Sequence, residues 1–142
     1  MSENKKPLSL EEGKIFIDGV EVIDAAKLTI LYQPKVWSGK MLGDKGTNRR
    51  WLGRDITGTL DEYRTTPRFN NIVAKYENDG ITPELTIQGI RVDKDSDYYE
   101  LSGSESVTLT GCVLTGDITL LSLDTDGEVV KDSISFGAKH IS

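Results

Sequence analysis

One segment, TPRFNNIVAKYENDG at Thr66–Gly80, has a helical pattern in a chain that otherwise has the patterns of β-strands. Its apolar side chains recur at positions i, i+3, i+4 and i+7, which places them on one face of a helix. These side chains are Phe69, Ile72, Val73 and Tyr76. Threonine suits an N-cap, proline the first turn, and glycine the left-handed residue after a helix. We therefore predict a helix over about Pro67–Asp79, capped by Thr66 and packed by its apolar face on β-structure.

Alternation of apolar and polar residues on both sides of this segment predicts strands. The chain opens with a hairpin signal, Asp18-Gly19 between two apolar runs. The strands that we expect cover residues 14–17, 20–22, 27–36, 54–63, 83–93, 106–114, 117–123 and 129–136. Many short strands and one helix predict a mainly β fold, either two packed antiparallel sheets or a β-barrel with one flanking α-helix.

Two of the expected strands, residues 27–36 and 54–63, have one apolar side and one polar side. Such strands turn one face to the core and the other face away from it. The polar positions are Lys27, Thr29 and Gln33 in the first strand and Asp55, Thr57, Thr59 and Asp61 in the second. Pro34 has no N–H to donate, so the far end of the first strand should be a sheet edge or a bulge.

The segment Trp37–Gly53 follows neither the helical nor the strand period, and we predict a long loop there. Loops of more than about 12 residues are uncommon in compact domains unless they are functional or disordered. Tryptophan, methionine and arginine are enriched in interface cores, so we interpret this loop as an assembly element that orders against a partner. The candidate contact residues are Trp37, Met41, Leu42, Arg49, Arg50, Trp51 and Arg54. The alternative is a loop folded onto its own domain, with both tryptophans in the core.

Composition limits the remaining possibilities. A chain of 142 residues is expected to form a single domain, with residues 1–11 as a flexible N-terminal arm. The Lys-rich start lacks the apolar region of a signal peptide, and Cys112 is the only cysteine, so we expect the chain to be made and kept in a cytoplasm. A formal charge of −6 without a basic stripe argues against a protein that grips nucleic acid.

The residues that carry most enzyme chemistry are scarce. His140 is the only histidine and lies near the C-terminus, which we expect to be frayed and solvated, so catalytic triads and zinc sites are not predicted. Residues 93–97 (DKDSD) resemble the start of a calcium loop, but Tyr98 and Ser104 occupy positions that need glycine and glutamate. We expect a solvated hairpin loop there, no cofactor, no metal and no enzymatic activity.

Adjacent carboxylates at Asp61 and Glu62 could be imagined as a glycosidase pair. Neighbouring residues of a strand point to opposite faces, so these two groups cannot flank one bond. We interpret them as solvated surface charges.

The order of motifs resembles the tail-tube proteins of contractile phage tails and of phage-tail-like particles of the PBSX defective-prophage type. The central matches are Gly53-Arg54, Gly58, the T-x-x-F at Thr66–Phe69, Tyr76, Gly80, Pro83 and the T-x-Q at Thr86–Gln88. The flanking matches are EGKIFIDG at Glu12–Gly19, SVTL at Ser106–Leu109 and SLDTD at Ser122–Asp126. Residues Val36–Arg50 do not match the family pattern.

The resemblance implies a structural subunit that forms hexameric rings, which stack into a hollow tube inside a sheath. It implies baseplate and tail-terminator partners, DNA only as non-specific passing cargo, and assembly in a virion tail or a phage-tail-like particle. The polar rows of residues 27–33 and 55–61 would then line the lumen, and the acidic balance would repel DNA phosphates. The same rows would also suit an ordinary solvated sheet.

Two alternatives remain open from the sequence. A tube protein of a type VI-like secretion system would share this architecture. A carbohydrate-binding β-sandwich could instead use Trp37 and Trp51 as stacking platforms.

Overall fold

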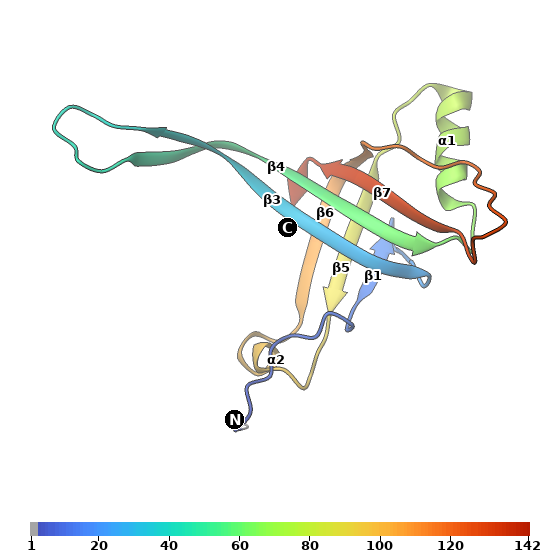
Figure 1. Cartoon of the computed structure of the whole chain (residues 1–142), viewed down its shortest axis with the longest axis horizontal. Coiled ribbons are helices and arrows are strands. Elements are labelled where there is room, and N and C mark those ends of the chain that lie inside the picture. Colours follow the sequence, from blue (N-terminus) through green and yellow to red (C-terminus); the bar gives the residue numbers. More distant parts are fainter. Residues whose placement is uncertain (1–2) are drawn as a thin grey trace.

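The computed structural model describes residues 3–142 and contains eight strands and two helices in that range (Figure 1). The elements are β1 (Lys14–Ile17), β2 (Val20–Glu21), β3 (Ala25–Gly39), β4 (Asn48–Tyr63), α1 (Arg68–Asp79), β5 (Leu85–Arg91), α2 (Asp97–Ser102), β6 (Glu105–Leu114), β7 (Lys131–Ala138) and β8 (His140–Ile141). Neither helix is long and apolar enough to cross a membrane within this range.

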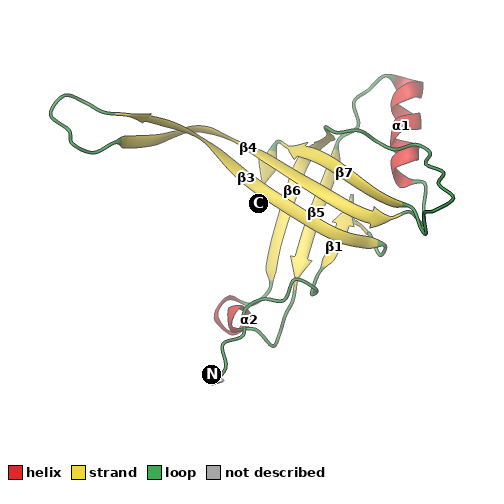
Figure 2. Ribbon diagram, viewed as in Figure 1, coloured by secondary structure: helices red, strands yellow, loops and turns green. Residues whose placement is uncertain are grey.

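The strands form one antiparallel, hydrogen-bonded path in the order β2-β1-β5-β6-β7-β4-β3, and β8 pairs with β6 (Figure 2). The mainly β class is therefore confirmed. The path does not close into a barrel, because β2 and β3 stand at its two ends. A groove of about 610 Å³, lined by parts of β1, β3, β5 and β6, lies where the two ends of the path approach each other.

The core lies between the two halves of this sheet. It is formed by inward-facing residues of β4, β5, β6 and β7, together with Phe69 of α1. The members with almost no exposed surface are Ile56, Leu60, Ile87, Leu109, Cys112 and Phe136. Ile56, Gly58 and Leu60 alternate along β4, so the inward side predicted for this strand is confirmed.

Gly58 allows β4 to approach both neighbouring strands, so a larger residue there should destabilise the fold. A Cβ atom at this position would lie 2.4 Å from Cζ of Phe136 and 2.9 Å from the backbone oxygen of Thr29. Overpacking of this kind costs roughly 1–3 kcal/mol. We expect Gly58→Ala to lower the free energy of unfolding in urea by that amount. Gly46→Ala, which meets no atom within 4 Å, is the control and should leave it unchanged.

Helix α1 begins one residue later than the sequence predicts. Pro67 occupies the N-cap position and its carbonyl accepts the N–H of Asn71 at 2.9 Å, whereas no side chain caps the helix. The prediction that Thr66 is the N-cap is therefore wrong. The C-terminal prediction is confirmed, since Gly80 has a φ of 70° and donates its N–H to the carbonyl of Tyr76.

Three other segments differ from the predictions. Residues 117–123 form no strand, and β8 pairs with β6 where a frayed end is expected. The loop expected at residues 93–104 contains α2, whose N-cap Ser96 accepts the N–H of Tyr99. The sheet also contains a bulge in β6 opposite residues 85–87, where Gly111 has a φ of 64°.

Hydrogen bonds connect the N-terminal segment to the loop before α2. The backbone N–H of Lys6 donates to Asp97 Oδ2 and that of Ser9 to Asp93 Oδ2, both at 3.1 Å. The Lys6 ammonium also pairs with Asp95 at 2.8 Å, which raises the pKa of Lys6. The acidic residues of 93–97 therefore hold residues 6–9 against the domain. Residues 1–2 of the N-terminal segment expected to be flexible lie outside the described chain.

Candidate functional site

A two-stranded arm projects from the sheet, formed by β3 and β4 beyond the core (Figure 1). We call residues 36–52 the arm and residues 40–47, which connect its strands, the tip. The prediction of an irregular loop over Trp37–Gly53 is wrong, because only the tip lacks strand pairing. A bulge explains the missed pattern. Leu52 is an extra residue opposite the step from Lys35 to Val36, and it breaks the alternation along β4.

The arm exposes large apolar side chains. Trp37 is 43% exposed and Trp51 is 62% exposed, so the alternative in which both tryptophans enter the core is wrong. The Trp51 ring instead lies 6.0 Å from the Tyr32 ring, centroid to centroid, and extends the apolar side of the hairpin beyond the core. Contiguous exposed apolar surface of this kind marks interaction sites in soluble proteins.

The tip is an ordered turn with two apolar residues at its end. The N–H of Asp44 donates to the carbonyl of Met41 at 3.0 Å, and the Asn48 amide donates to Asp44 Oδ2 at 2.8 Å. Met41 and Leu42 are exposed to solvent, and Leu42 is fully exposed. Because the turn is already ordered, binding of these side chains by a partner would cost little further conformational entropy.

The basic candidates divide into two groups. Arg49 and Arg50 are exposed on the arm next to the tip. Arg54 lies at the base of the arm, where its guanidinium donates to the backbone oxygen of Lys139 at 2.9 Å. Arg54 therefore supports the arm from its own domain.

A polar face covers one side of β3, β4 and β7. The register pairs Lys27 with Asp61, Thr29 with Thr59 and Gln33 with Asp55, and residues directly opposite in an antiparallel pair share a face. Thr57 lies opposite Leu31 and within 3.4 Å of the Gln33 amide oxygen. On β7, Ser133 and Ser135 continue the same face. The structure thus brings all seven predicted polar positions together.

The polar face is rich in hydroxyl groups, and its charges balance. Lys27 stands directly opposite Asp61, and Asp55 is diagonal to Lys35 in the register, since Lys35 pairs with Gly53. The net charge of −6 therefore resides mainly on other surfaces. The register therefore does not support the expectation that the acidic balance of the chain lies on this face and repels DNA phosphates.

The side chains on the predicted apolar side of α1 differ in how deeply they are buried. Phe69 is 4% exposed and belongs to the core, and Ile72 packs against it. Val73 and Tyr76 line a groove beside the helix, and Tyr76 is 47% exposed.

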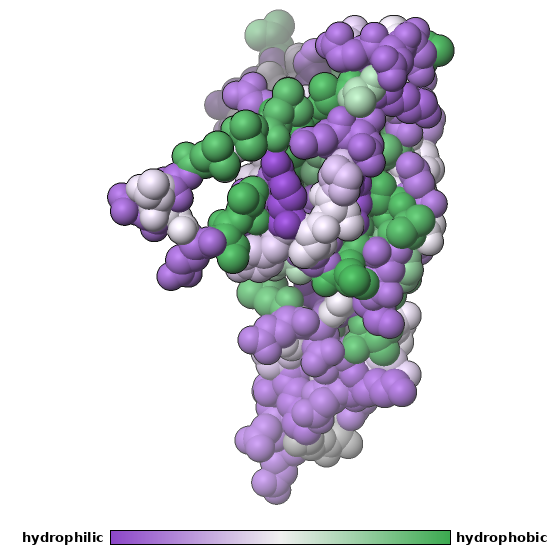
Figure 3. Space-filling view, turned by 90° about the vertical axis from the view of Figure 1, so that its right-hand side faces the viewer, coloured by the Kyte–Doolittle hydropathy of each residue, from purple (hydrophilic) through white to green (hydrophobic). Residues whose placement is uncertain are grey.

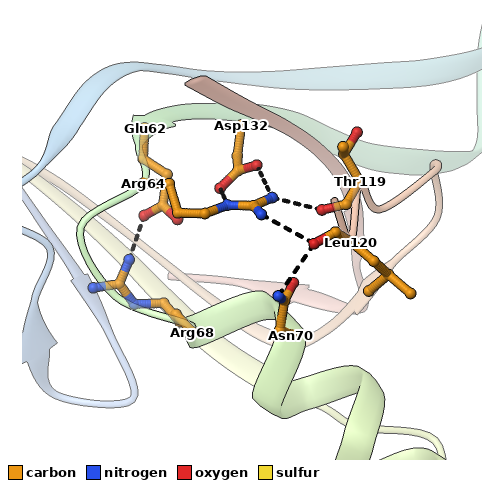
Figure 4. Close-up of polar contacts among 7 residues, drawn as sticks. All are labelled: Glu62, Arg64, Arg68, Asn70, Thr119, Leu120 and Asp132. Atoms are coloured by element: carbon orange, nitrogen blue, oxygen red, sulfur yellow. Dashed lines mark hydrogen bonds and ion pairs between the residues drawn. The ribbon is translucent and has the colours of Figure 1, made fainter. Parts of the chain in front are cut away.

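A buried ionic cluster joins α1 to the sheet and was missed by the sequence analysis (Figure 4). Glu62, expected to be a solvated charge, has no exposed surface and accepts a hydrogen bond from the guanidinium of Arg68. Arg68 also lies 3.6 Å from Asp24. Glu62 continues the inward series of Ile56, Gly58 and Leu60, so the alternation of β4 contained the signal for its burial.

The second half of the cluster holds the irregular segment before β7. Arg64 forms a bidentate pair with Asp132, at 2.6 and 3.1 Å, and this pair raises the pKa of Arg64. The same guanidinium donates to the backbone oxygens of Thr119 and Leu120 at 2.5 and 3.1 Å (Figure 4). The cluster therefore connects the ends of β4, α1 and β7.

Burial raises the pKa of Glu62 to about 7, against the opposing effect of Arg68. The folded protein then holds a proton that the unfolded chain releases near 4.5, so this stabilisation is complete below that pH and is lost as the pH rises through 7. The loss is about 3 kcal/mol at most.

We expect the unfolding free energy of the wild type to fall between pH 5 and pH 8 by more than that of Glu62→Gln. Urea titrations at both pH values measure the difference. Glu77→Gln, which alters an exposed carboxylate of α1, should keep the wild-type dependence. Equal pH dependence in wild type and Glu62→Gln would contradict the assignment.

Within residues 3–142, no group of three or more His, Cys, Asp or Glu side chains could hold a metal ion. Cys112 is buried with a free thiol, and burial raises its pKa. The surface features of the described chain that remain as candidate sites are the arm, the polar face and the groove beside α1.

Comparisons with known proteins identify the family of this chain. The family model for phage tail tube proteins matches residues 2–140. The chain is also 27% identical to the phage-like element PBSX protein XkdM of Bacillus subtilis (strain 168) over 129 residues, which cover 91% of this chain and 84% of that relative.

Solved structures share the fold at low identity. A chain of the PVC sheath/tube terminator, from an extracellular contractile injection system in the extended state, matches with a TM-score of 0.71 and 10% identity over 97% of this chain and 96% of that chain. A chain of the 6-fold symmetrised baseplate of the anti-feeding prophage matches with a TM-score of 0.62 and 9% identity, over 100% and 96% of the two chains. Since the family model spans almost the whole sequence, the chain belongs to the phage tail tube protein family.

Proposed function

We propose that six copies of this chain form a ring, and that rings stack head to tail into the hollow tube of a phage tail or phage-tail-like particle. The family match supports the tube, and the six-fold symmetry of the anti-feeding prophage baseplate supports the number. The observation that carries the proposal is the continuous polar face on β3, β4 and β7, which lies opposite the apolar core.

Unpaired strand edges favour closure between copies. Strand β3 pairs only with β4 among the described residues, so much of its 15-residue length has a free edge. Long free edges invite pairing with another chain. In the proposed ring, the edge of β3 meets a neighbouring copy and the polar faces of six copies surround the lumen.

The chemistry of the polar face suits passage of a charged cargo. Hydroxyl groups with balanced charges provide little attraction for DNA phosphates. In this proposal DNA is a non-specific cargo, or the tube itself punctures a membrane. The polar residues 27–33 and 55–61 line the channel, and the exposed residues of the arm contact the next ring.

The partners follow from the same architecture. PVC and anti-feeding prophage chains with this fold belong to assemblies with a sheath, a terminator or a baseplate. We propose matching partners for this chain, with synthesis in the bacterial cytoplasm before assembly. The family match favours this role over a type VI-like system or a carbohydrate-binding module.

Electron microscopy and sedimentation of the purified protein test the proposal. We expect rings with six-fold symmetry and, at higher concentration, tubes. A protein that stays monomeric across a wide concentration range, with no rings or tubes in micrographs, would overturn it.

A further inference from the structure

An apolar groove of about 240 Å³ lies beside α1, at the end of the molecule opposite the arm (Figure 1). We call it the α1 groove. It is lined by residues of α1, of the strands β5 and β6 and of the segments beside them, including Ile72, Val73, Tyr76, Pro83, Val113 and Ile118. A cavity of roughly 150 Å³ accommodates benzene in an apolar core, so this groove has room for a leucine or methionine side chain.

Acidic residues flank the lining of the groove. Glu77 follows Tyr76, Glu84 follows Pro83 and Asp117 precedes Ile118 in the chain, and these three carboxylates are exposed. One basic residue, Lys75, lies among them. Figure 3 views the molecule from this end and shows hydrophobic surface bordered by hydrophilic surface. The α1 groove is therefore an apolar hollow with a net acidic surround.

The tip of the arm has the complementary features. Its apolar residues Met41 and Leu42 are exposed. Residues 40–50 carry four basic side chains and one acidic side chain, in a chain whose net charge is −6. The basic residues are Lys40, Lys45, Arg49 and Arg50. A basic, apolar projection and an acidic, apolar hollow thus occupy opposite ends of the longest axis of the molecule (Figure 1).

We propose that the tip of one copy docks in the α1 groove of a second copy, with Met41 or Leu42 filling the hollow and the basic residues facing its acidic surround. The inference rests on the proposed tube and names the receiving surface of its axial contact. Each copy has one tip and one groove, so the contact is heterologous and repeats from ring to ring.

A second exposed apolar segment fits the groove less well. Leu121 and Leu123 are 74% and 85% exposed, but Asp124, Asp126 and Glu128 follow them closely. Like charges across an interface oppose association. Charge complementarity therefore selects the tip as the occupant.

Cross-linking between two variants that each carry one introduced cysteine tests the contact in the full chain. Leu42→Cys is mixed with a mass-tagged Tyr76→Cys variant under assembly conditions, and a short bismaleimide is added. The native Cys112 is buried and serves as the background. We expect a mixed dimer between the two variants.

Control pairs identify other occupants. Leu10→Cys and Leu123→Cys, both at exposed positions, replace Leu42→Cys in parallel reactions and should give little mixed dimer. A Tyr76→Cys product with either control, and none with Leu42→Cys, would overturn the inference.

Micrographs of the same mixtures separate this inference from the proposed function. Tubes without the 42–76 product would overturn the docking site and leave the tube intact. The 42–76 product without rings or tubes would support the docking site and contradict the tube. Absence of both would contradict both.

Charge reversal provides a second measurement. Lys40→Glu with Lys45→Glu should raise the concentration needed for tube formation about tenfold, since rim charges set complementarity. Glu77→Lys with Glu84→Lys on the receiving side should restore assembly when combined with the first pair. Failure of the combined variant to improve on the first pair would contradict the proposed partners.

Discussion

Replacement of the tip by a two-residue turn is expected to give a folded protein that no longer forms tubes. The change removes Lys40–Thr47 and joins Gly39 to Asn48 through Asn-Gly. Gly39 and Asn48 are paired in register, and Asn-Gly favours the turn type that connects two such strands. The removed residues are mostly exposed, so the free energy of unfolding should change by about 0.5 kcal/mol or less.

Tubes should be lost because the tip carries the apolar and basic residues proposed for the axial contact. Sedimentation and electron microscopy measure assembly, and urea unfolding confirms the fold. Leu10→Ser is the control, since it removes another highly exposed leucine, outside the arm. Normal tubes from the shortened protein would exclude the tip as the stacking element.

The helix was predictable because its signals are local. Its apolar spacing and Gly80 are contained within fifteen residues, and α1 spans Arg68–Asp79. The cap was mispredicted because Thr66 and Pro67 are both acceptable at a helix start, and only the tertiary position of the chain decides between them.

The arm was not predictable as a hairpin because its pairing depends on a long-range register. Residues 36–39 pair with residues 48–51 on the far side of the bulge at Leu52. The extra residue shifts the alternation of β4 by one position, so the sequence shows no continuous period of two there. Exposure on both faces also removes the contrast between apolar and polar sides on which strand prediction relies. Composition still indicated the interface character of this segment, which remains a prediction.

The ionic cluster was not predictable from the sequence for a different reason. Glu62 follows the inward phase of β4, but a charge in that phase is ordinarily interpreted as the end of the buried strand. Its partner is Arg68, six residues away, which also lies 3.6 Å from Asp24 in another part of the chain. Similarly, the pattern of apolar and polar residues predicts a strand over residues 117–123, whose apolar residues are mostly leucines. In the fold those leucines are exposed, and Arg64 holds the segment through its carbonyl groups.

Phe69→Ala is expected to cause the largest loss of stability, roughly 3–5 kcal/mol, because it empties a buried ring site in the core. Of the twelve residues of α1, all described, Phe69 alone is buried. A domain of this size has a total stability of about 5–15 kcal/mol, so the variant should unfold at a much lower urea concentration. Circular dichroism in urea, under conditions where the protein is monomeric, measures the midpoint.

Two variants at related positions show whether the loss comes from the buried ring. Phe69→Leu keeps most of the apolar volume and should lose less than Phe69→Ala. Tyr76→Ala removes a ring of similar size from the same helix, but that ring is about half exposed and should cost less. If Phe69→Ala and Tyr76→Ala had equal midpoints, α1 would be held to the sheet mainly by the Arg68–Glu62 contact, and Phe69 would not be its anchor.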